Sequence, residues 1–285
     1  MLRKLLPWWI RILLKVILSR LNVSYTIWQK IGLFRHGKMD DESYAIKVFD
    51  RHVNFAGLQE KLTGLHIVEI GPGDNLSTGL ISYANGAQST LIDVGNFANF
   101  REKNYRQLQK RLNANLGVDL HLNFTDEESY LNQVDCSYYI DGLDSLKKID
   151  SNSADFLFSQ AVLEHVKKED FRETIYETKR ILKPNSFCSH RVDLRDHLGG
   201  KLNNLRFSEQ LWEGNLFSLS GFYTNRLRLN EIVNIFCNVG FEIVSIKKNN
   251  WSTLPIKPHQ IHRSIKYDNL EELKTFSFDI LCSSN

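Results

Sequence analysis

The stretch Val68-Glu69-Ile70-Gly71-Pro72-Gly73-Asp74 is the sharpest local signal in the sequence, an apolar strand that runs into a glycine turn. Gly71 and Gly73 lack a Cβ atom, so the backbone can turn sharply there and approach a ligand closely. Asp93 ends the next apolar run, where a carboxylate can accept the hydroxyl protons of a ribose. The G-x-G-x-x-G pattern fails at Leu76, so no helix N-terminus is prepared for a pyrophosphate. We therefore predict a site for a nucleoside without phosphates.

Short apolar runs alternate with helical patterns from residue 40 to the C-terminus. This alternation is typical of an α/β fold in which helices cover both faces of a parallel sheet. Helices are predicted at residues 99–113, 160–182 and 226–239, the last ending at Gly240 as a C-cap. Seven strands are predicted, at residues 66–70, 89–94, 136–140, 154–159, 186–194, 241–247 and 276–283.

Glu69-Ile70-Gly71-Pro72-Gly73 resembles motif I of the class I S-adenosylmethionine-dependent methyltransferases. Ser159-Gln160-Ala161-Val162-Leu163-Glu164-His165-Val166 and Arg180-Ile181-Leu182-Lys183-Pro184-Asn185 resemble the fourth strand with its helix and the entry to the fifth strand of that family. The resemblance covers about residues 60–285 and implies a Rossmann-like, mostly parallel sheet whose last strand is antiparallel. Asn75 and Asn185-Ser186 replace glycines of the family pattern, and asparagine tolerates the same turns.

The resemblance implies S-adenosyl-L-methionine as the cofactor and assigns residues to it. Glu69 would help to hold the methionine ammonium group, and Gly71 and Gly73 would pass beneath the adenosine and methionine portions. Asp93 would accept the ribose hydroxyls.

Residues after the third and fourth predicted strands complete the expected cofactor site. Asp141, followed by Gly142, would accept a hydrogen bond from the exocyclic amine of the adenine, although Asp141 could instead cap a turn. Ser159 and Gln160 would lie beside the methionine tail and the mouth for the substrate.

The densest group of titratable side chains is His190-Arg191-Val192-Asp193-Leu194-Arg195-Asp196-His197. Histidine is the usual base near neutral pH. We predict His197 as the catalytic base, with Asp193 or Asp196 as its orienting carboxylate; a structural salt-bridge cluster is the alternative. Glu164 and His165 are interpreted as scaffold at the start of a helix, and the sequence predicts no metal site.

Residues 198–224 interrupt the alternation between the fifth and sixth predicted strands. Such an insertion hangs over the carboxyl edge of the sheet, where open α/β sheets bind ligands. Its aromatic residues are either the core of a small lid or a wall for a sugar or apolar acceptor: Trp212, Phe217, Phe222 and Tyr223.

Residues 1–39 contain eight Lys or Arg residues and no acid, so the rest of the chain is acidic. This asymmetry predicts an anionic partner at the N-terminus and argues against nucleic acid. Residues 1–20 gather basic side chains on one helix face opposite an apolar face with two tryptophans, which favours an anionic membrane surface. A helix packed on the domain, a signal peptide and a transit peptide are alternatives. The four cysteines form no C-x-x-C pair and are interpreted as buried residues in a reducing compartment.

These observations predict two regions, a basic amphipathic segment at residues 1–39 and a methyltransferase domain at residues 40–285. The expected activity is O-methylation of a glycan, lipid-linked or small-molecule acceptor by a cytoplasmic enzyme at the inner face of the membrane. The glycan expectation comes from the segments around residues 190–197, 204–212 and 221–226, which resemble bacterial methyltransferases associated with glycan clusters. An inactive membrane-associated scaffold and a nicotinamide-dependent oxidoreductase are the alternatives.

Overall fold

The computed structural model describes residue 10 and residues 41–285. The predicted amphipathic segment, residues 1–39, therefore lies outside the described residues apart from Ile10. None of the described helices has the length and apolar character needed to cross a bilayer.

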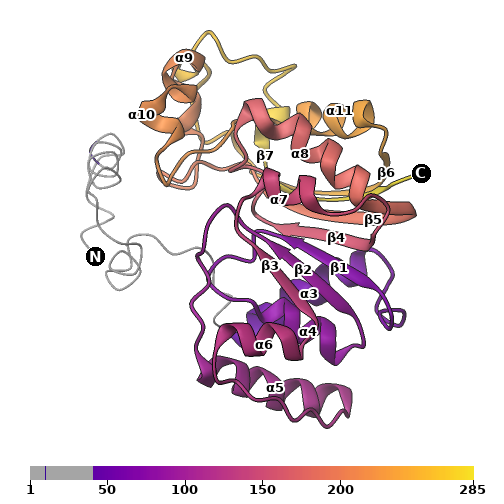
Figure 1. Ribbon diagram of the computed structural model, residues 1–285. Helices are drawn as coiled ribbons and strands as arrows, with labels where there is room; N and C mark the ends of the chain where they lie inside the picture. Colours follow the sequence, from indigo (N-terminus) through magenta and orange to yellow (C-terminus); the bar gives the residue numbers. More distant parts are fainter. Residues whose placement is uncertain (1–9, 11–40) are drawn as a thin grey trace.

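A seven-stranded sheet with the order β3-β2-β1-β4-β5-β7-β6 forms the centre of the fold (Figure 1). The first five strands are parallel, and β7 pairs antiparallel with both β5 and β6. The predicted Rossmann-like, mostly parallel fold is confirmed. The strands are β1 (His66–Ile70), β2 (Gln88–Ile92), β3 (Cys136–Tyr139), β4 (Ala154–Gln160), β5 (Leu182–Asp193), β6 (Glu242–Asn250) and β7 (Thr275–Ser283).

Helices cover both faces of the sheet, and the prediction for residues 160–182 was wrong at its start. The strand β4 continues to Gln160, and the helix begins only at Lys168. Ala161 has a φ of 57°, which turns the chain away from a helical path. The helices are α3 (Glu42–Phe55), α4 (Ser77–Ala84), α5 (Glu102–Leu116), α6 (Glu127–Gln133), α7 (Leu143–Lys148), α8 (Lys168–Ile181), α9 (Glu209–Glu213), α10 (Asn215–Ser218) and α11 (Leu229–Val239).

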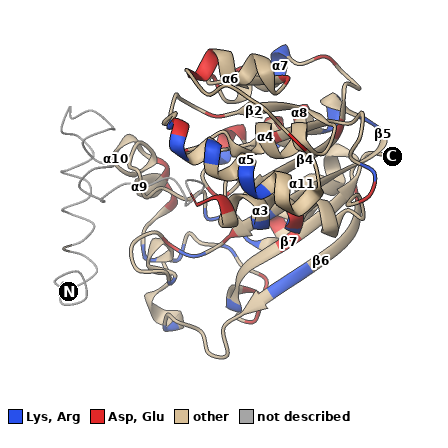
Figure 2. Cartoon of the chain, turned by 90° about the horizontal axis from the view of Figure 1, so that it is seen from below, with Lys and Arg blue, Asp and Glu red and all other residues tan. Residues whose placement is uncertain are grey.

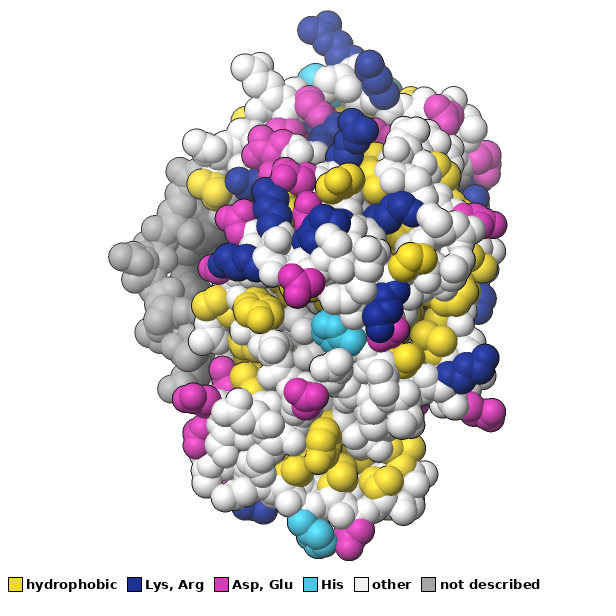
Figure 3. Space-filling model, turned by 45° about the vertical axis from the view of Figure 1, so that its right-hand side comes forward, with side chains coloured by type: hydrophobic (Ala, Val, Ile, Leu, Met, Phe, Trp, Pro, Cys, Tyr) yellow, Lys and Arg dark blue, Asp and Glu magenta, His cyan; other side chains and the backbone are white. Residues whose placement is uncertain are grey.

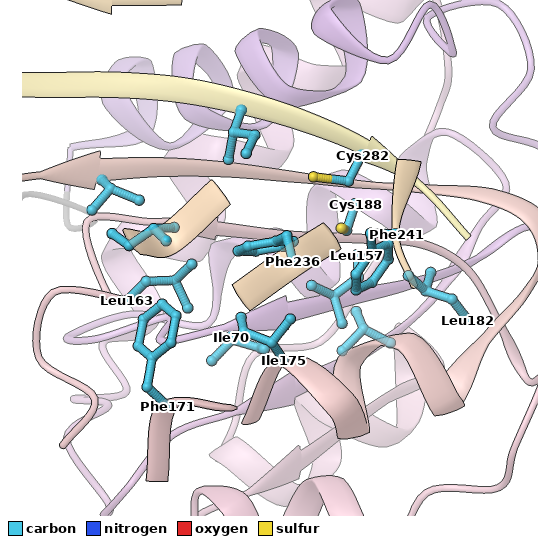
Figure 4. Packing of buried hydrophobic residues seen from close by; sticks show 14 of the residues in the cluster. Ile70, Leu157, Leu163, Phe171, Ile175, Leu182, Cys188, Phe236, Phe241 and Cys282 are labelled. Carbon is cyan, nitrogen blue, oxygen red and sulfur yellow. The ribbon is translucent and has the colours of Figure 1, made fainter. Parts of the chain in front are cut away.

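Two apolar cores lie on opposite faces of the sheet. One packs α3, α4 and α5 on the sheet, and the other packs α8 and α11 on it. In the second core, Phe171 and Phe236 point toward the strands, and Cys188 and Cys282 lie beside each other on paired strands (Figure 4). Three of the four cysteines are buried as predicted, but Cys237 is exposed on α11.

A small cap forms beside the sheet from two segments far apart in sequence, residues 198–224 and 251–274. The first segment packs around the fully buried Trp212. The aromatic residues of residues 198–224 bury one another, so they are the core of the cap and the alternative of an acceptor wall was wrong. The second segment joins through Ile256 and Leu273, which pack on Leu202 and Leu205. Figure 1 shows α9 and α10 to the upper left of the sheet, below the long connection between β6 and β7.

Charged residues of both signs are spread over the described helices and strands (Figure 2). On the face shown in Figure 3, basic and acidic side chains lie next to one another and the apolar side chains form small separate groups. The basic excess of the chain therefore belongs to residues 1–39.

Candidate active site

The turn after β1 packs tightly against the ends of its neighbouring strands. The amide of Gly71 donates to the carbonyl of Ile92 at 2.7 Å, and Gly71 has a φ of 77°. A Cβ atom on Gly71 would lie 2.3 Å from Cγ2 of Val162, in the turn after β4. A glycine is required here because the backbone is left-handed and the neighbouring turn leaves no space for a side chain.

Asp93 links this turn to the end of β2. Its Oδ2 accepts a hydrogen bond from the amide of Gly73 at 3.1 Å, and its Oδ1 accepts from the amide of Val94 at 2.8 Å. Each carboxylate oxygen can accept a second hydrogen bond. These two hydrogen bonds fix the carboxylate of Asp93 beside the glycine turn, where its oxygen atoms suit hydroxyl donors.

Glu69 ends buried beneath the same turn, and its Oε2 has no hydrogen-bond partner among the described residues. Burial raises the pKa of Glu69 to about 7, and the negative charge of Asp93 adds to this rise, while Thr78 opposes it. A buried carboxyl group with unused acceptor capacity fits a cationic ligand group at this position.

The turn after β3 lies next to Asp93. The amide of Gly142 donates to the carbonyl of Asp93 at 2.8 Å, and Gly142 has a φ of 54°. The carboxylate of Asp141 forms an exposed ion pair with Lys148 at 3.0 Å. The predicted contact of Asp141 with the adenine stays a prediction, and its side chain pairs with Lys148 at the surface.

Ser159 and Gln160 end β4, and both side chains have partners away from the glycine turn. The Ser159 hydroxyl lies 2.8 Å from Nδ1 of His190 and is fully buried. The Gln160 side chain accepts hydrogen bonds from Arg51 and His52 of α3. The predicted role of Ser159 and Gln160 beside the methionine tail therefore stays a prediction.

The chain after β5 places His197 past the strand end, as predicted. The carboxylate of Asp196 accepts hydrogen bonds from the amides of Leu198, Gly199 and Asn203 and from the side-chain amide of Asn203. Asp196 therefore fixes the loop, and its acceptor capacity is used by the main chain and by Asn203.

Asp193, the other predicted orienting carboxylate, binds Arg195. Arg195 donates from Nε at 2.9 Å and from its terminal nitrogen at 2.6 Å. Burial would raise the pKa of Asp193, but the hydrogen bonds and charge of Arg195, with a smaller contribution from His197, lower it below its ordinary value. His197 thus interacts electrostatically with Asp193, as the predicted pair requires. Asp193 also forms a salt bridge with Arg195, as the alternative prediction of a structural cluster requires.

The structure brings His197 together with two residues that the sequence interpretation had set aside. Glu164, His165 and His197 offer ligand atoms that all lie within 4.8 Å of one another. The rings of His165 and His197 meet edge to face at 4.7 Å. Glu164 is buried, and burial raises its pKa to about 8, an effect that nearby amides and Arg191 offset only in part. The sequence signal was present in the Glu164-His165 pair, but the position of His197 beside it depends on the fold.

The glycine turn after β1, Asp93 after β2, and the cluster of Glu164, His165 and His197 after β4 and β5 therefore lie along the carboxyl edge of the sheet. Residues 68–189 match the family model described as a methyltransferase domain. These residues are a class I methyltransferase domain. Its cofactor is S-adenosylmethionine.

Solved structures with similar folds share little sequence with this methyltransferase. A putative methyltransferase in complex with the Haloferax volcanii Trm112 methyltransferase activator is 16% identical, with a TM-score of 0.45, 87% of this chain covered and 96% of the other. An S-adenosylmethionine-dependent methyltransferase from Methanosarcina mazei is 18% identical, with a TM-score of 0.44, 77% of this chain covered and 92% of the other. The comparison with curated protein sequences found no significant match.

The residues of the edge fit S-adenosylmethionine. The buried Oε2 of Glu69, which has no partner among the described residues, suits the methionine ammonium group, and the carboxylate of Asp93 suits the ribose hydroxyls. Gly71 permits the tight turn that a close approach of the cofactor requires.

Proposed function

We propose that this methyltransferase transfers the methyl group to a hydroxyl oxygen of a glycan, lipid-linked or small-molecule acceptor at a membrane surface. The observation that carries the proposal is the cluster of Glu164, His165 and His197, where the turn after β4 meets the loop after β5 at the carboxyl edge. A hydroxyl group is a weak nucleophile that must lose its proton, whereas an amine with a lone pair needs no such help. Histidines and carboxyl groups beside the acceptor supply that help.

The positions of these residues along the edge indicate which of them bind the cofactor and which act on the acceptor. S-adenosylmethionine supplies a methyl group that is already activated for displacement. Glu69 holds the methionine ammonium group, Asp93 holds the ribose hydroxyls, and Gly71 fixes the turn between these two residues. The remaining tasks are to align the acceptor in line with the methyl group and to assist loss of its proton, and we assign them to the side of the edge that carries His165 and His197.

The activity is tested with the full chain and S-adenosylmethionine that carries a labelled methyl group. Purified protein is incubated with membrane lipid, glycan and small-molecule fractions, and the labelled product is analysed by mass spectrometry. The proposal expects a gain of one methyl group on an oxygen atom. Label on nitrogen or carbon would contradict the O-methyl assignment, and cofactor binding without label in any fraction would favour the inactive scaffold.

Asp93→Ala is expected to weaken S-adenosylmethionine binding by about 1.5 to 3 kcal/mol, because two ribose hydroxyls lose their charged acceptor. Calorimetric titration measures the affinity. Asp119→Ala, which removes an exposed acid in the loop after α5, is the matched control and should bind as the wild type does. Unchanged affinity in folded Asp93→Ala protein would remove Asp93 from the site.

The affinity for S-adenosylmethionine is expected to rise as the pH increases from about 6 to about 7.5. Glu69 has its pKa raised to about 7, so it is mostly protonated at the lower pH and mostly ionised at the higher one. The methionine ammonium group favours the ionised carboxylate, so binding should strengthen on the order of tenfold over this interval. Titrations of the wild type and of Glu69→Gln measure the effect. A glutamine variant that keeps the full pH dependence would show that another group is responsible.

Residues 1–20 are expected to bring the enzyme to anionic vesicles. Each basic side chain near an anionic surface contributes about 1 kcal/mol, and burial of the apolar face contributes about 25 cal/mol per Å². Salt screens only the first contribution, so binding should weaken but persist at high ionic strength. Co-sedimentation compares the full chain, a chain that begins at Asp41, and a full chain in which Arg3, Lys4, Arg11 and Lys15 are replaced by Gln. Equal sedimentation of all three would contradict membrane binding through this segment.

A further inference from the structure

Three side chains with metal-ligating atoms converge where the turn after β4 meets the loop after β5. Glu164 and His165 come from the turn, and His197 comes from the loop. Their ligand atoms all lie within 4.8 Å of one another. Two atoms that bind the same transition-metal ion at about 2.1 Å lie at most about 4.2 Å apart, so small side-chain rotations bring all three into one coordination shell.

The carboxyl group of Glu164 is the second observation that points to a ligand. Glu164 is 2% exposed, and neither of its oxygen atoms makes a hydrogen bond of normal geometry with the described residues, although the amides of Glu164 and Asp193 lie near the carboxyl group. Buried polar atoms nearly always have a partner, because burial of a carboxyl group without one is unfavourable. A cation at the point where the two histidines meet would supply the missing partner.

His165 is oriented in the way that metal-binding histidines commonly are. Its Nδ1 donates to the carbonyl oxygen of Tyr223 at 2.9 Å. In a neutral ring this hydrogen bond places the lone pair on Nε2, the nitrogen that would bind an ion. A bond from the second ring nitrogen to a main-chain carbonyl is typical of histidine ligands, because it fixes both the tautomer and the ring orientation.

Both chain segments are held in place by other buried groups. Asn225 donates from its side chain to the carbonyl oxygens of Leu163 and Val166, and its amide donates to the carbonyl oxygen of Glu164. The carboxylate of Asp196 anchors the loop that carries His197. The ligand positions are therefore set by the fold, which lowers the cost of ordering them around an ion.

We propose that Glu164, His165 and His197 bind one divalent transition-metal ion at the acceptor side of the active site. Two imidazole ligands and one carboxylate suit zinc, iron and related ions better than magnesium or calcium, which prefer oxygen ligands alone. Three protein ligands leave coordination positions open, as catalytic metal sites do. Those positions are available to an oxygen atom of the acceptor.

The role of the ion rests on the proposed O-methyl transfer. An acceptor hydroxyl bound to a divalent cation loses its proton more readily, and this proton leaves to water. The oxygen then forms a bond to the methyl carbon while the bond between that carbon and sulfur breaks, and the bonding electrons stay on sulfur. The products are the methylated acceptor, S-adenosylhomocysteine and one proton. No redox partner is required.

The experiment titrates the full-length protein, freed of metal by chelation, with Co²⁺ in the absence of S-adenosylmethionine. The visible absorption of Co²⁺ reports nitrogen ligands, and calorimetry with Zn²⁺ gives the stoichiometry and affinity. One ion per chain is expected. Glu164→Gln and His197→Ala should each lower the affinity at least about 100-fold, since each removes a direct ligand. His121→Ala removes an exposed histidine in the loop after α5 and should leave the affinity unchanged.

Thermal unfolding shows that each variant is folded before it is compared. Binding of fewer than one ion per chain, or equal affinity in wild type, Glu164→Gln and His197→Ala, would overturn the site. A separate titration of the metal-free chain with S-adenosylmethionine distinguishes the two proposals. Cofactor binding and methyl transfer without metal binding would overturn this inference alone. A bound ion that depends on these ligands, in a chain without methyl transfer, would support the site and contradict the proposed function.

Discussion

Replacing His197 by alanine is expected to lower the turnover of methyl transfer by about 10² to 10⁴, while the affinity for S-adenosylmethionine stays unchanged. His197 stands past the end of β5 with His165 and Glu164, whereas the turn that contains Gly71 and the carboxylate of Asp93 lie on the other side of β4. Loss of the imidazole therefore slows the loss of the proton from the acceptor hydroxyl and leaves the cofactor contacts in place. Initial rates with the labelled cofactor and the active fraction, together with calorimetry, measure the two effects.

The matched control is His121→Ala, which should keep full turnover. A parallel fall in turnover and in cofactor affinity for His197→Ala would indicate a structural role and contradict the prediction. The metal content of His197→Ala then shows whether His197 acts on the acceptor as a metal ligand or as the group that takes the proton. Loss of the ion together with turnover identifies a metal ligand, whereas a retained ion with lost turnover identifies a group that takes the proton directly.

The strands β1, β2 and β4 were predictable because each is a short, largely buried run bounded by turn residues, whereas β5 begins four residues before its predicted start, in the polar segment Leu182-Lys183-Pro184-Asn185. The run His66–Ile70 and the following glycines gave the central strand and its turn, and β2 and β4 were also located within two residues at each end. Parallel strands have their carboxyl ends at one edge, so the positions of Asp93 and His197 along that edge followed from the same pattern. The pattern did not predict which way a side chain at the strand end points. Ser159, for example, forms a hydrogen bond with His190 in the interior.

The cap and the histidine cluster depend on contacts between distant parts of the chain. Residues 251–274 join the cap through Ile256 and Leu273, and no local pattern in that segment indicates its partner. From the sequence, Glu164 and His165 were assigned to the start of a helix. In the structure they lie in a turn whose main-chain carbonyls at Leu163 and Val166 accept hydrogen bonds from the side chain of Asn225, and this distant contact is not visible in the sequence. The prediction that the chain has no metal site rested on cysteine spacing, which does not bear on a site such as the one proposed for Glu164, His165 and His197.

Gly71→Ala is expected to lower the affinity for S-adenosylmethionine by about 100-fold or more and to destabilise the fold. The added methyl group meets Cγ2 of Val162 at 2.3 Å, and the φ of 77° is unfavourable for alanine. The left-handed conformation costs about 1 to 2 kcal/mol, and the clash adds about 1 to 3 kcal/mol unless the turn moves. Movement of the turn pulls the amide of Gly73 away from Asp93, and the cofactor loses an ordered site. Calorimetry and thermal unfolding measure both effects.

Gly64→Ala separates the two causes. Gly64 has a φ of 78°, and a Cβ atom there would meet no atom within 4 Å, so this variant carries the conformational cost without the clash. It should lose about 1 to 2 kcal/mol of stability and keep its cofactor affinity. The double variant Gly71→Ala with Val162→Ala removes the two γ-methyl groups and should recover part of the lost affinity, whereas Val162→Ala alone should bind nearly as the wild type does. Full affinity in Gly71→Ala, or no recovery in the double variant, would show that the contact between the turns after β1 and β4 does not shape the cofactor site.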